Sequence, residues 1–245
     1  VDSQGQPTGS AVPFKGFKGE IHTTSADLDN DGQQEILAAA GSGGGPVISI
    51  LDSKTGATRA SFFAFSPAFT GGVFIAAKDI NNDGIIDIIA GAGAGGGPHV
   101  KIFDGASLNP FVSFFAFSVA FTGGVSVASA DINNDGIFDI VTGAGPGGGP
   151  HVKVFDGANG NIISQWFAYP IGFTGGVFVG VGDLGNDGNL EVVTGTGVGG
   201  APVVAVWNPF NGVLLSQFLA YDKAFTGGVR VAVGDLSGDN IPDLV

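Results

Sequence analysis

The sequence repeats itself every 52 residues, and this period constrains the fold more than any other feature. Five units start at constant spacing, at Phe17, Phe69, Phe121, Phe173 and Phe225. The last four open with Phe-Thr-Gly-Gly-Val, whereas the first reads Phe-Lys-Gly-Glu-Ile. A period of this length is typical of arrays in which each unit buries its apolar face against the next.

Each unit contains four strand-like stretches and none with helical periodicity. In the third unit they cover residues 125–130, 138–142, 151–155 and 161–169, which are short apolar runs bounded by turn residues. Four short strands in a period of roughly 50 residues predict an all-β fold, a β-propeller of four-stranded antiparallel blades. We expect residues 1–245 to form a single domain of this kind, since the length is ample for one large core.

The two ends do not complete a whole number of units. Val245 aligns with Val141 in a second strand, and Val1-Asp2 resembles Phe155-Asp156 at the end of a third strand. The equivalent of residues 142–154 is missing between them. We favour five blades with one incomplete blade shared by the two termini, because closure removes sheet edges that would otherwise pair with other chains. A slice of a longer propeller is the alternative.

An acidic nine-residue loop recurs in every unit. Oxygen-bearing side chains stand at positions 1, 3, 5 and 9 of the first three copies, and position 6 is glycine, or Asn240 in the last copy. Glycine and asparagine tolerate the positive φ of a sharp turn. Hard cations such as Ca²⁺ take roughly six to eight oxygen ligands, so this spacing predicts cation sites. The five loops cover residues 27–35, 79–87, 131–139, 183–191 and 235–243.

Two alternatives to this prediction explain less of the pattern. An EF-hand needs Glu at position 12 and flanking helices, but that position is Ala or Thr here and the flanks resemble strands. Metal-free Asp-Gly hairpin turns account for the turn but not for the acids four residues before and after it. The last two loops are the weaker candidates, because Gly185 and Ser237 remove a strong ligand from position 3.

The net charge of −13 comes mainly from these loops, which hold 16 of the 22 acidic residues, four in the first and three in each of the others. The charge argues against nucleic acid as a partner and against insertion into an anionic membrane. We expect the metal-free loops to repel themselves and to lower stability. The chain has no cysteine and no apolar run of membrane-spanning length.

Aromatic clusters at residues 62–65, 114–117 and 166–169 recur from unit to unit, as packing between neighbouring blades requires. We interpret them as core rather than as a stacking platform for sugars. Strand alternation places the acidic loops and the Asp-Gly turns on one face of the propeller. The glycine-rich connections on the opposite face carry few reactive side chains.

No residues point clearly to catalysis. His99 and His151 are copies of each other, and His22 on a predicted strand indicates an exposed or satisfied histidine rather than a general base. The carboxylates are used as ligands, and a metal whose shell is closed by protein oxygens supplies strength rather than chemistry. Four cations break the repeat pattern but look scattered along the chain, namely Arg59, Lys78, Lys223 and Arg230.

The Phe-Thr-Gly-Gly segment, the acidic loop and the later Gly-Gly-Pro together resemble the FG-GAP repeat family, which forms the propellers of integrin α-subunits and of many bacterial extracellular proteins. The fourth unit departs from it with Gly200-Ala-Pro202. In that family the loop between the first two strands of a blade binds Ca²⁺, and main-chain carbonyls at position 7 complete the shell. The resemblance implies side-chain ligands at Asp27, Asp29, Asp31 and Glu35; Asp79, Asn81, Asp83 and Asp87; Asp131, Asn133, Asp135 and Asp139; Asp183, Asp187 and Glu191; and Asp235, Asp239 and Asp243, with carbonyl ligands at Gln33, Ile85, Ile137, Asn189 and Ile241.

The resemblance also implies a function. We expect an extracellular or cell-surface propeller, stabilised by up to five Ca²⁺ ions, that acts as a non-catalytic structural or adhesion module. Its partner would be a protein or a glycan at the face opposite the calcium loops. A carbohydrate-binding propeller and a part of a polysaccharide-acting enzyme are the alternatives.

Overall fold

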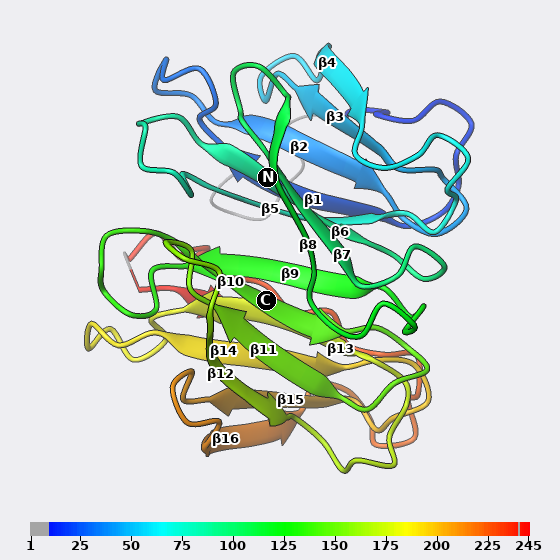
Figure 1. The fold of residues 1–245 in the computed structure, drawn as a ribbon, viewed down its shortest axis with the longest axis vertical. Coiled ribbons are helices and arrows are strands. Elements are labelled where there is room, and N and C mark those ends of the chain that lie inside the picture. Colours follow the sequence, from blue (N-terminus) through cyan, green and yellow to red (C-terminus); the bar gives the residue numbers. More distant parts are fainter. Residues whose placement is uncertain (1–9, 240) are drawn as a thin grey trace.

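The computed structural model describes residues 10–239 and 241–245, and these residues form strands and turns only. Four consecutive units each build one four-stranded sheet, which we call the first to fourth blades, and the fifth unit contributes a two-stranded sheet. Figure 1 shows the four blades in chain order, with β3 and β4 at one end of the view and β15 and β16 at the other. The all-β prediction is therefore confirmed.

The blades share one design, a meander in which each strand pairs antiparallel with the next. The first two blades contain β1 (Ile21–Ala26), β2 (Glu35–Ala40), β3 (Val47–Leu51), β4 (Thr58–Phe63), β5 (Val73–Lys78), β6 (Asp87–Ala92), β7 (His99–Phe103) and β8 (Pro110–Phe115). The remaining strands are β9 (Val125–Ala130), β10 (Asp139–Ala144), β11 (His151–Phe155), β12 (Ile162–Phe167), β13 (Val177–Gly182), β14 (Glu191–Thr196), β15 (Val203–Trp207), β16 (Leu214–Leu219), β17 (Val233–Gly234) and β18 (Asp243–Leu244).

The innermost strands surround one central channel. The second residue of each inner strand, or its equivalent in the fifth unit, points into this channel, and these residues are His22, Phe74, Ser126, Phe178 and Arg230. Glu20 and Arg230 form an ion pair that joins the first unit to the fifth. All five units thus lie around one axis.

Apolar side chains fill the space between neighbouring blades. One aromatic of each of the first three outer strands packs on the end of the third strand of the next blade, in the pairs Phe62–Phe103, Phe114–Phe155 and Trp166–Trp207, with ring centroids 5.0, 5.1 and 6.1 Å apart. This confirms the prediction that the repeated aromatics are core, with one correction. The middle aromatic of each cluster is exposed, because successive residues of a strand face opposite ways; these residues are Phe63, Phe115 and Phe167.

The fifth unit is shared between the two ends of the chain, as predicted. A Cβ placed on Gly212 would lie 2.7 Å from Cβ of Trp166, in the outer strand of the preceding blade. A Cβ on Gly56, at the same repeat position, would lie 3.1 Å from Cβ of Ala11. The segment at Ala11 therefore lies where the outer strand of the fifth unit is expected. Val1, Asp2 and Asn240 lie outside the described residues.

Within the described part of the chain there is no helix that could cross a membrane.

Candidate metal sites

Each acidic loop joins the first two strands of its unit and is held by its own carboxylates. In the second loop, Asp79 Oδ2 accepts a hydrogen bond from the amide of Gly84 at 2.9 Å, and Asp83 Oδ1 accepts one from the amide of Ile85 at 2.8 Å. Asp87 Oδ2 accepts one from the amide of Ile80 at 2.9 Å. The third loop repeats these bonds at Asp131, Asp135 and Asp139. Hydrogen bonds from amides of the same loop to its carboxylates thus hold each of these loops in a closed turn.

Two residues in each of the first four loops adopt the left-handed conformation. Position 6 was expected to do so, and Gly84 has φ 87°. Position 4 does so as well, which the sequence reasoning missed although asparagine at this position was a signal. The position-4 residues are Asn30, Asn82, Asn134 and Asn186, with φ between 50° and 60°.

The position-9 carboxylates lie deepest. Asp87 and Asp139 are fully buried. Asp87 Oδ1 has no hydrogen-bond partner among the described residues. Burial, together with the charges of Asp83 and Asp79, raises the pKa of Asp87 to about 6. A buried carboxylate oxygen without a hydrogen-bond partner destabilises the folded state, so a cation bound at this oxygen would stabilise it.

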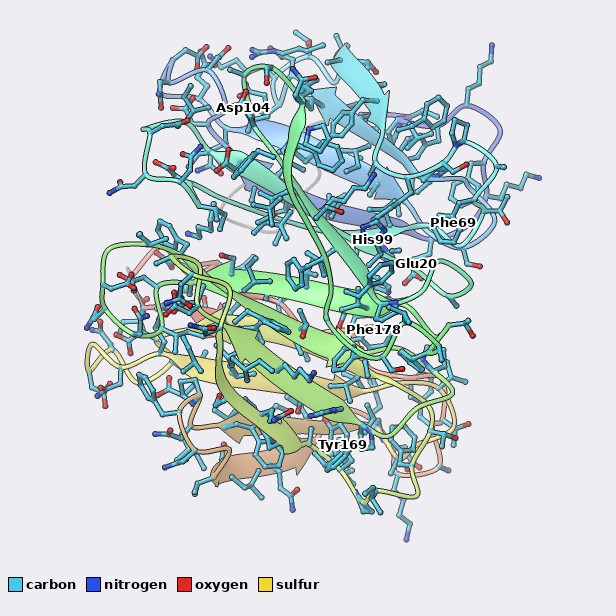
Figure 2. The ribbon with its side chains drawn as sticks, viewed as in Figure 1. Glu20, Phe69, His99, Asp104, Tyr169 and Phe178 are labelled. Carbon is cyan, nitrogen blue, oxygen red and sulfur yellow. The ribbon has the colours of Figure 1, made fainter. Side chains whose placement is uncertain are left out.

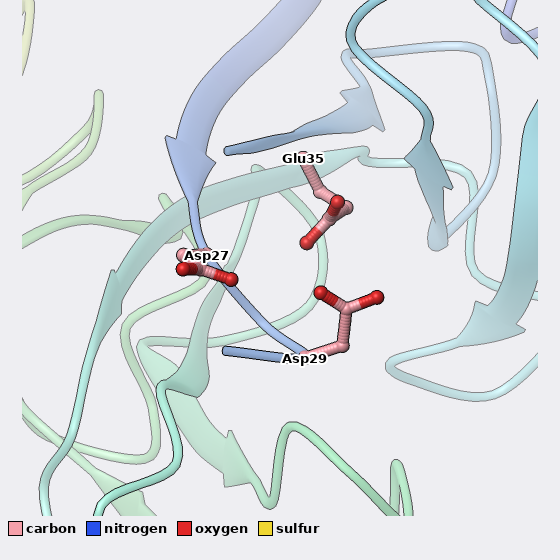
Figure 3. A group of neighbouring side chains, drawn as sticks. All are labelled: Asp27, Asp29 and Glu35. Carbon is pink, nitrogen blue, oxygen red and sulfur yellow. The ribbon is translucent and has the colours of Figure 1, made fainter. Parts of the chain in front are cut away.

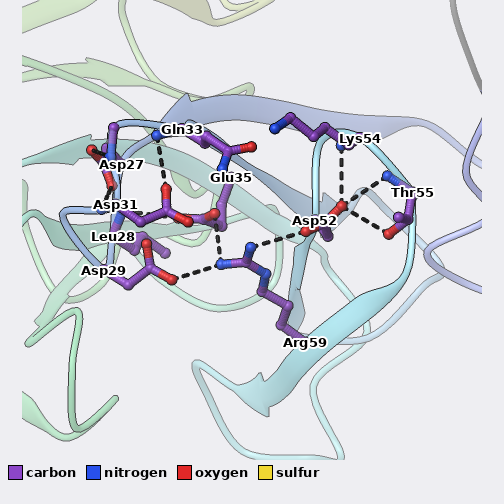
Figure 4. Close-up of polar contacts among 11 residues, drawn as sticks. Asp27, Leu28, Asp29, Asp31, Gln33, Glu35, Asp52, Lys54, Thr55 and Arg59 are labelled. Atoms are coloured by element: carbon purple, nitrogen blue, oxygen red, sulfur yellow. Dashed lines mark hydrogen bonds and ion pairs between the residues drawn. The ribbon is translucent and has the colours of Figure 1, made fainter.

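The first loop differs from the second, because a guanidinium already lies on its ligands. Oxygens of Asp27, Asp29 and Glu35 approach within 4.8 Å of one another, and their side chains point toward one region (Figure 3). Arg59 Nη1 from β4 lies 2.8 Å from Asp29 Oδ2 and 2.8 Å from Glu35 Oε1. Arg59 Nη2 donates to Asp52 Oδ2 at 2.9 Å, in the next turn (Figure 4). The carboxylate oxygens of this loop are therefore close together, and Arg59 partly neutralises their negative charge.

The same contacts fix the face on which the loops lie. Asp52 lies in the turn after the third strand, and the Thr55 hydroxyl and amide, with Arg59, hold its pKa well below the ordinary value. In the third blade the amide of Gly157, in the equivalent turn, donates to Asp139 Oδ1 at 2.9 Å. Acidic loops and Asp-Gly turns thus share one face, as predicted.

The fourth and fifth loops keep fewer ligands. Asp183 and Asp187 hold the fourth loop closed, and the amide of Leu184 donates to Glu191 at 2.9 Å. Position 3 is Gly185, which has no side-chain oxygen. In the fifth loop the amide of Ser237 donates to Asp243 at 2.9 Å, and Asp235 and Asp239 accept amides as in the other loops.

The position-7 residues lie beside the carboxylates in every loop. Their amides donate to the position-5 aspartates at 2.8 to 2.9 Å, and the residues are Gln33, Ile85, Ile137, Asn189 and Ile241. Coordination through their carbonyls stays a prediction.

The glycine-rich face carries a cluster of ionisable side chains, which corrects the expectation that this face has few reactive side chains. Glu20, His22 and Arg230 converge at a cavity of about 660 Å³ at the channel mouth. His22 Nδ1 lies 2.6 Å from the carbonyl of Val73, and burial lowers the pKa of His22. Arg230 lies 4.0 Å from the Phe178 ring centroid, and Glu20 and Phe178 are labelled in Figure 2. The sequence did not indicate this cluster, because Glu20 and His22 lie more than 200 residues before Arg230 and meet it only where the first and fifth units line the same channel.

Comparison with known proteins supports the architecture. The sequence model of the FG-GAP-like repeat matches residues 27–90 and 79–142. None of the curated proteins compared matches the chain.

Solved structures share the fold at low identity. The Vibrio cholerae biofilm matrix protein Bap1 is 23% identical over 87% of this chain and 30% of its own, with a TM-score of 0.52. The rhamnogalacturonan lyase YesW is 13% identical over 97% of this chain and 48% of its own, with a TM-score of 0.55. The WD40 repeats of RRP9 are 18% identical over 91% of this chain and 59% of their own, with a TM-score of 0.53. The chain thus spans between 30% and 59% of the lengths of these proteins.

The 52-residue repeat, the four-stranded blades and the match of two consecutive repeats agree with one another. The chain is a β-propeller of the FG-GAP-like repeat family.

Proposed function

We propose that this protein is an extracellular, calcium-stabilised propeller that serves as a non-catalytic structural or interaction module. The observation that carries the proposal is the buried Asp87 Oδ1, which has no partner among the described residues. Oxygen donors only, arranged in a tight loop, suit Ca²⁺ rather than a softer metal. Residues at positions 1, 3, 5 and 9 would hold the ion, which would neutralise carboxylates and fix the turn.

The expected stabilisation is large. Extracellular calcium modules bind with Kd values of roughly 10⁻⁴ to 10⁻³ M. At ten times Kd each site adds about 1.4 kcal/mol, and five independent sites add about 7 kcal/mol. This is comparable with the whole stability of an ordinary domain, about 5–15 kcal/mol. Extracellular calcium is abundant enough to maintain such sites, which supports the proposed location.

Calorimetry with and without a chelator tests the proposal. Exchanging calcium for EDTA should lower the melting temperature by about 15–25 °C, given about 2–4 °C per kcal/mol for a chain of this size. Elemental mass spectrometry of the dialysed protein should find calcium. An unchanged melting temperature together with no bound metal would refute the calcium role.

A structural role also agrees with one similar protein, since Bap1 is described as a biofilm matrix protein. A lyase with the same fold, YesW, acts on rhamnogalacturonan, which leaves carbohydrate recognition as the second candidate. The observation that favours it is the cavity at the channel mouth, where Glu20, Ser126 and Arg230 offer polar groups beside Phe74. A glycan array probed in calcium tests it, and an Arg230→Ala variant should lose any hit that depends on this cavity.

A further inference from the structure

A cavity of about 380 Å³ lies between the second and third blades. It is lined by Gly148 and Gly149 of the glycine-rich connection, by His151 and Lys153 of β11, and by Phe167 of β12. None of its lining residues lies in an acidic loop or lines the cavity at the channel mouth. It is therefore separate from the sites described above.

Phe167 gives this cavity an exposed aromatic wall. The side chain is 46% exposed, and its ring centroid lies 4.8 Å from that of His151, with 31° between the two planes. His151 in turn lies 5.4 Å from the ring centroid of Phe117, just after the outer strand of the second blade. The imidazole thus supports Phe167 from inside and holds an apolar ring at the surface, where another flat apolar face can pack on it.

Lys153 places a cation beside this wall. It follows His151 by two residues on β11, so both side chains lie on the same side of the strand. Its Nζ donates to the carbonyl of Ala116 at 3.0 Å, which uses one of its three N–H donors. Burial lowers the pKa of Lys153. Among the described residues no carboxylate forms an ion pair with it, so a bound anion would stabilise this partly buried charge.

The second blade contains a second copy of the arrangement. Every residue that lines the cavity has an identical residue 52 positions earlier. His99 stacks on the exposed Phe115, with ring centroids 4.6 Å apart. Lys101 Nζ donates to the carbonyl of Ala64 at 3.2 Å, and it too has no ion pair in the part of the chain that the structure describes. Figure 2 labels His99 and Phe69, which belong to this copy.

The first and fourth blades lack the polar half of the arrangement. Val47 and Val203 have the repeat position of the histidine, and Ser49 and Ala205 have that of the lysine. These blades form the same four-stranded sheets, so the blade architecture does not require histidine and lysine there. The first blade keeps an exposed ring, because Phe63 is 55% exposed.

We propose that each of the two copies binds one acidic unit of an anionic polysaccharide, a pyranose ring that carries a carboxylate. The apolar face of the pyranose packs on Phe115 or Phe167, and the carboxylate accepts the remaining N–H donors of Lys101 or Lys153. Two equivalent sites one repeat apart suit a polymer of repeating acidic units. This assignment goes beyond the proposed function, since it requires neither bound calcium nor the channel mouth.

Calorimetric titration with hexamers of glucuronate and of galacturonate tests the proposal. The uncharged match is the same hexamer with its carboxylates methyl-esterified. At least one hexamer should bind the chain in calcium, and its methyl ester should bind at least about tenfold more weakly, because the charged hydrogen bonds to the lysines are lost.

The lysines are tested together, so that one site cannot mask loss of the other. Lys101→Gln combined with Lys153→Gln keeps an N–H donor on each side chain but removes the charge. This chain should bind the acidic hexamer at least about tenfold more weakly, whereas Lys101→Arg combined with Lys153→Arg should retain most of the affinity. Thermal melts in the same buffer check that both chains are folded.

The exposed rings provide a matched comparison. Phe115→Ala combined with Phe167→Ala should lower the affinity about fivefold, since the aromatic walls are lost. Phe63→Ala removes an equally exposed ring from the first blade, which lacks the histidine and the lysine, and should leave the affinity unchanged.

Several results would overturn the proposal. They are no binding of either hexamer, equal affinity for the methyl ester, unchanged affinity of the glutamine chain, and equally tight binding of a hexaglutamate peptide, which would make the ligand an acidic peptide. Binding that is lost in Arg230→Ala but not in the glutamine chain would place the polysaccharide at the channel mouth instead. Failure of the calcium role would appear separately, as a melting temperature that EDTA does not change, and the titrations would keep their meaning.

Discussion

The first and second acidic loops have the same backbone turn but balance their charge in different ways. In the first, Arg59 reaches Asp29 and Glu35 from β4. In the second, the equivalent position of β8 is Phe111, and Asp87 Oδ1 is buried without a partner among the described residues. One loop thus has a cation supplied by the chain, whereas under the proposed calcium role the other would take its cation from solution. Copies of one sequence motif need not have the same metal dependence.

The largest expected difference between the loops follows calcium removal. In EDTA, protection of the Gly84 and Gly136 amides against hydrogen exchange should fall by about 100-fold, because under the proposed calcium role their loops lose the charge that compensates their carboxylates. The Gly32 amide, which makes the same 2.9 Å bond to its own aspartate, should lose less than about tenfold. Exchange measured by mass spectrometry checks this, and equal losses in the three loops would remove the distinction.

Substitution of the position-9 acids should change the melting temperature in EDTA in opposite directions for the first and second loops. Asp87→Asn should lower the melting temperature in calcium by about 3–6 °C, since one site is lost. In EDTA the same change should raise it, because a buried uncompensated charge is removed.

Glu35→Gln is the matched change in the first loop. It should lower the melting temperature in both conditions, since Arg59 loses a partner whether or not calcium is present. Calorimetry of the two variants is the measurement, and the same sign in EDTA for both would contradict the comparison.

Replacing Arg59 by phenylalanine, the residue of the next blade, should convert the first loop to the behaviour of the second. Calcium affinity of the first loop should rise about tenfold, as expected for removal of a competing charge, and the melting temperature in EDTA should fall. Calcium titration followed by calorimetry checks both. Lys54→Phe removes a neighbouring exposed cation and should leave both quantities unchanged.

The smallest effect is a pH dependence specific to the metal-free second loop. The pKa of Asp87 is raised from 3.8 to about 6 in the folded chain. The folded state therefore binds the Asp87 proton more tightly than the unfolded state does, so the contribution of Asp87 to stability is greatest at low pH and is lost as pH rises between about 4 and 6. Thermal melts in EDTA should show this decline, a few degrees in size, and Asp87→Asn should flatten it. A decline that persists in the variant would assign it to other groups.

Much of the fold could be predicted because it is local and repeated. The spacing of the five Phe residues set the blade period, and residues 125–130 and 151–155 were predicted as strands with the bounds of β9 and β11. Other bounds shifted, since the predicted strand 138–142 begins at Asp139 and ends at Ala144. Short apolar runs mark where a strand exists better than where it stops.

What could not be predicted depends on contacts between residues far apart in the sequence. Arg59 and Asp29 lie 30 residues apart within the first blade, and Glu20 and Arg230 lie 210 residues apart in the first and fifth units. The 52-residue period relates equivalent positions of different units, so it does not show which different positions come into contact. One signal was available in the sequence. Arg59 stands where the other units have an apolar residue, and it belongs to the unit whose loop has a fourth acid.

The central channel imposes a further condition on a chain made of duplicated units. The same repeat position contributes His22, Phe74, Ser126, Phe178 and Arg230 to one narrow axis. Five phenylalanines would collide there, and five arginines would repel one another. Divergence at this position therefore lets large, small and charged side chains share one axis, which five copies of phenylalanine or of arginine could not do.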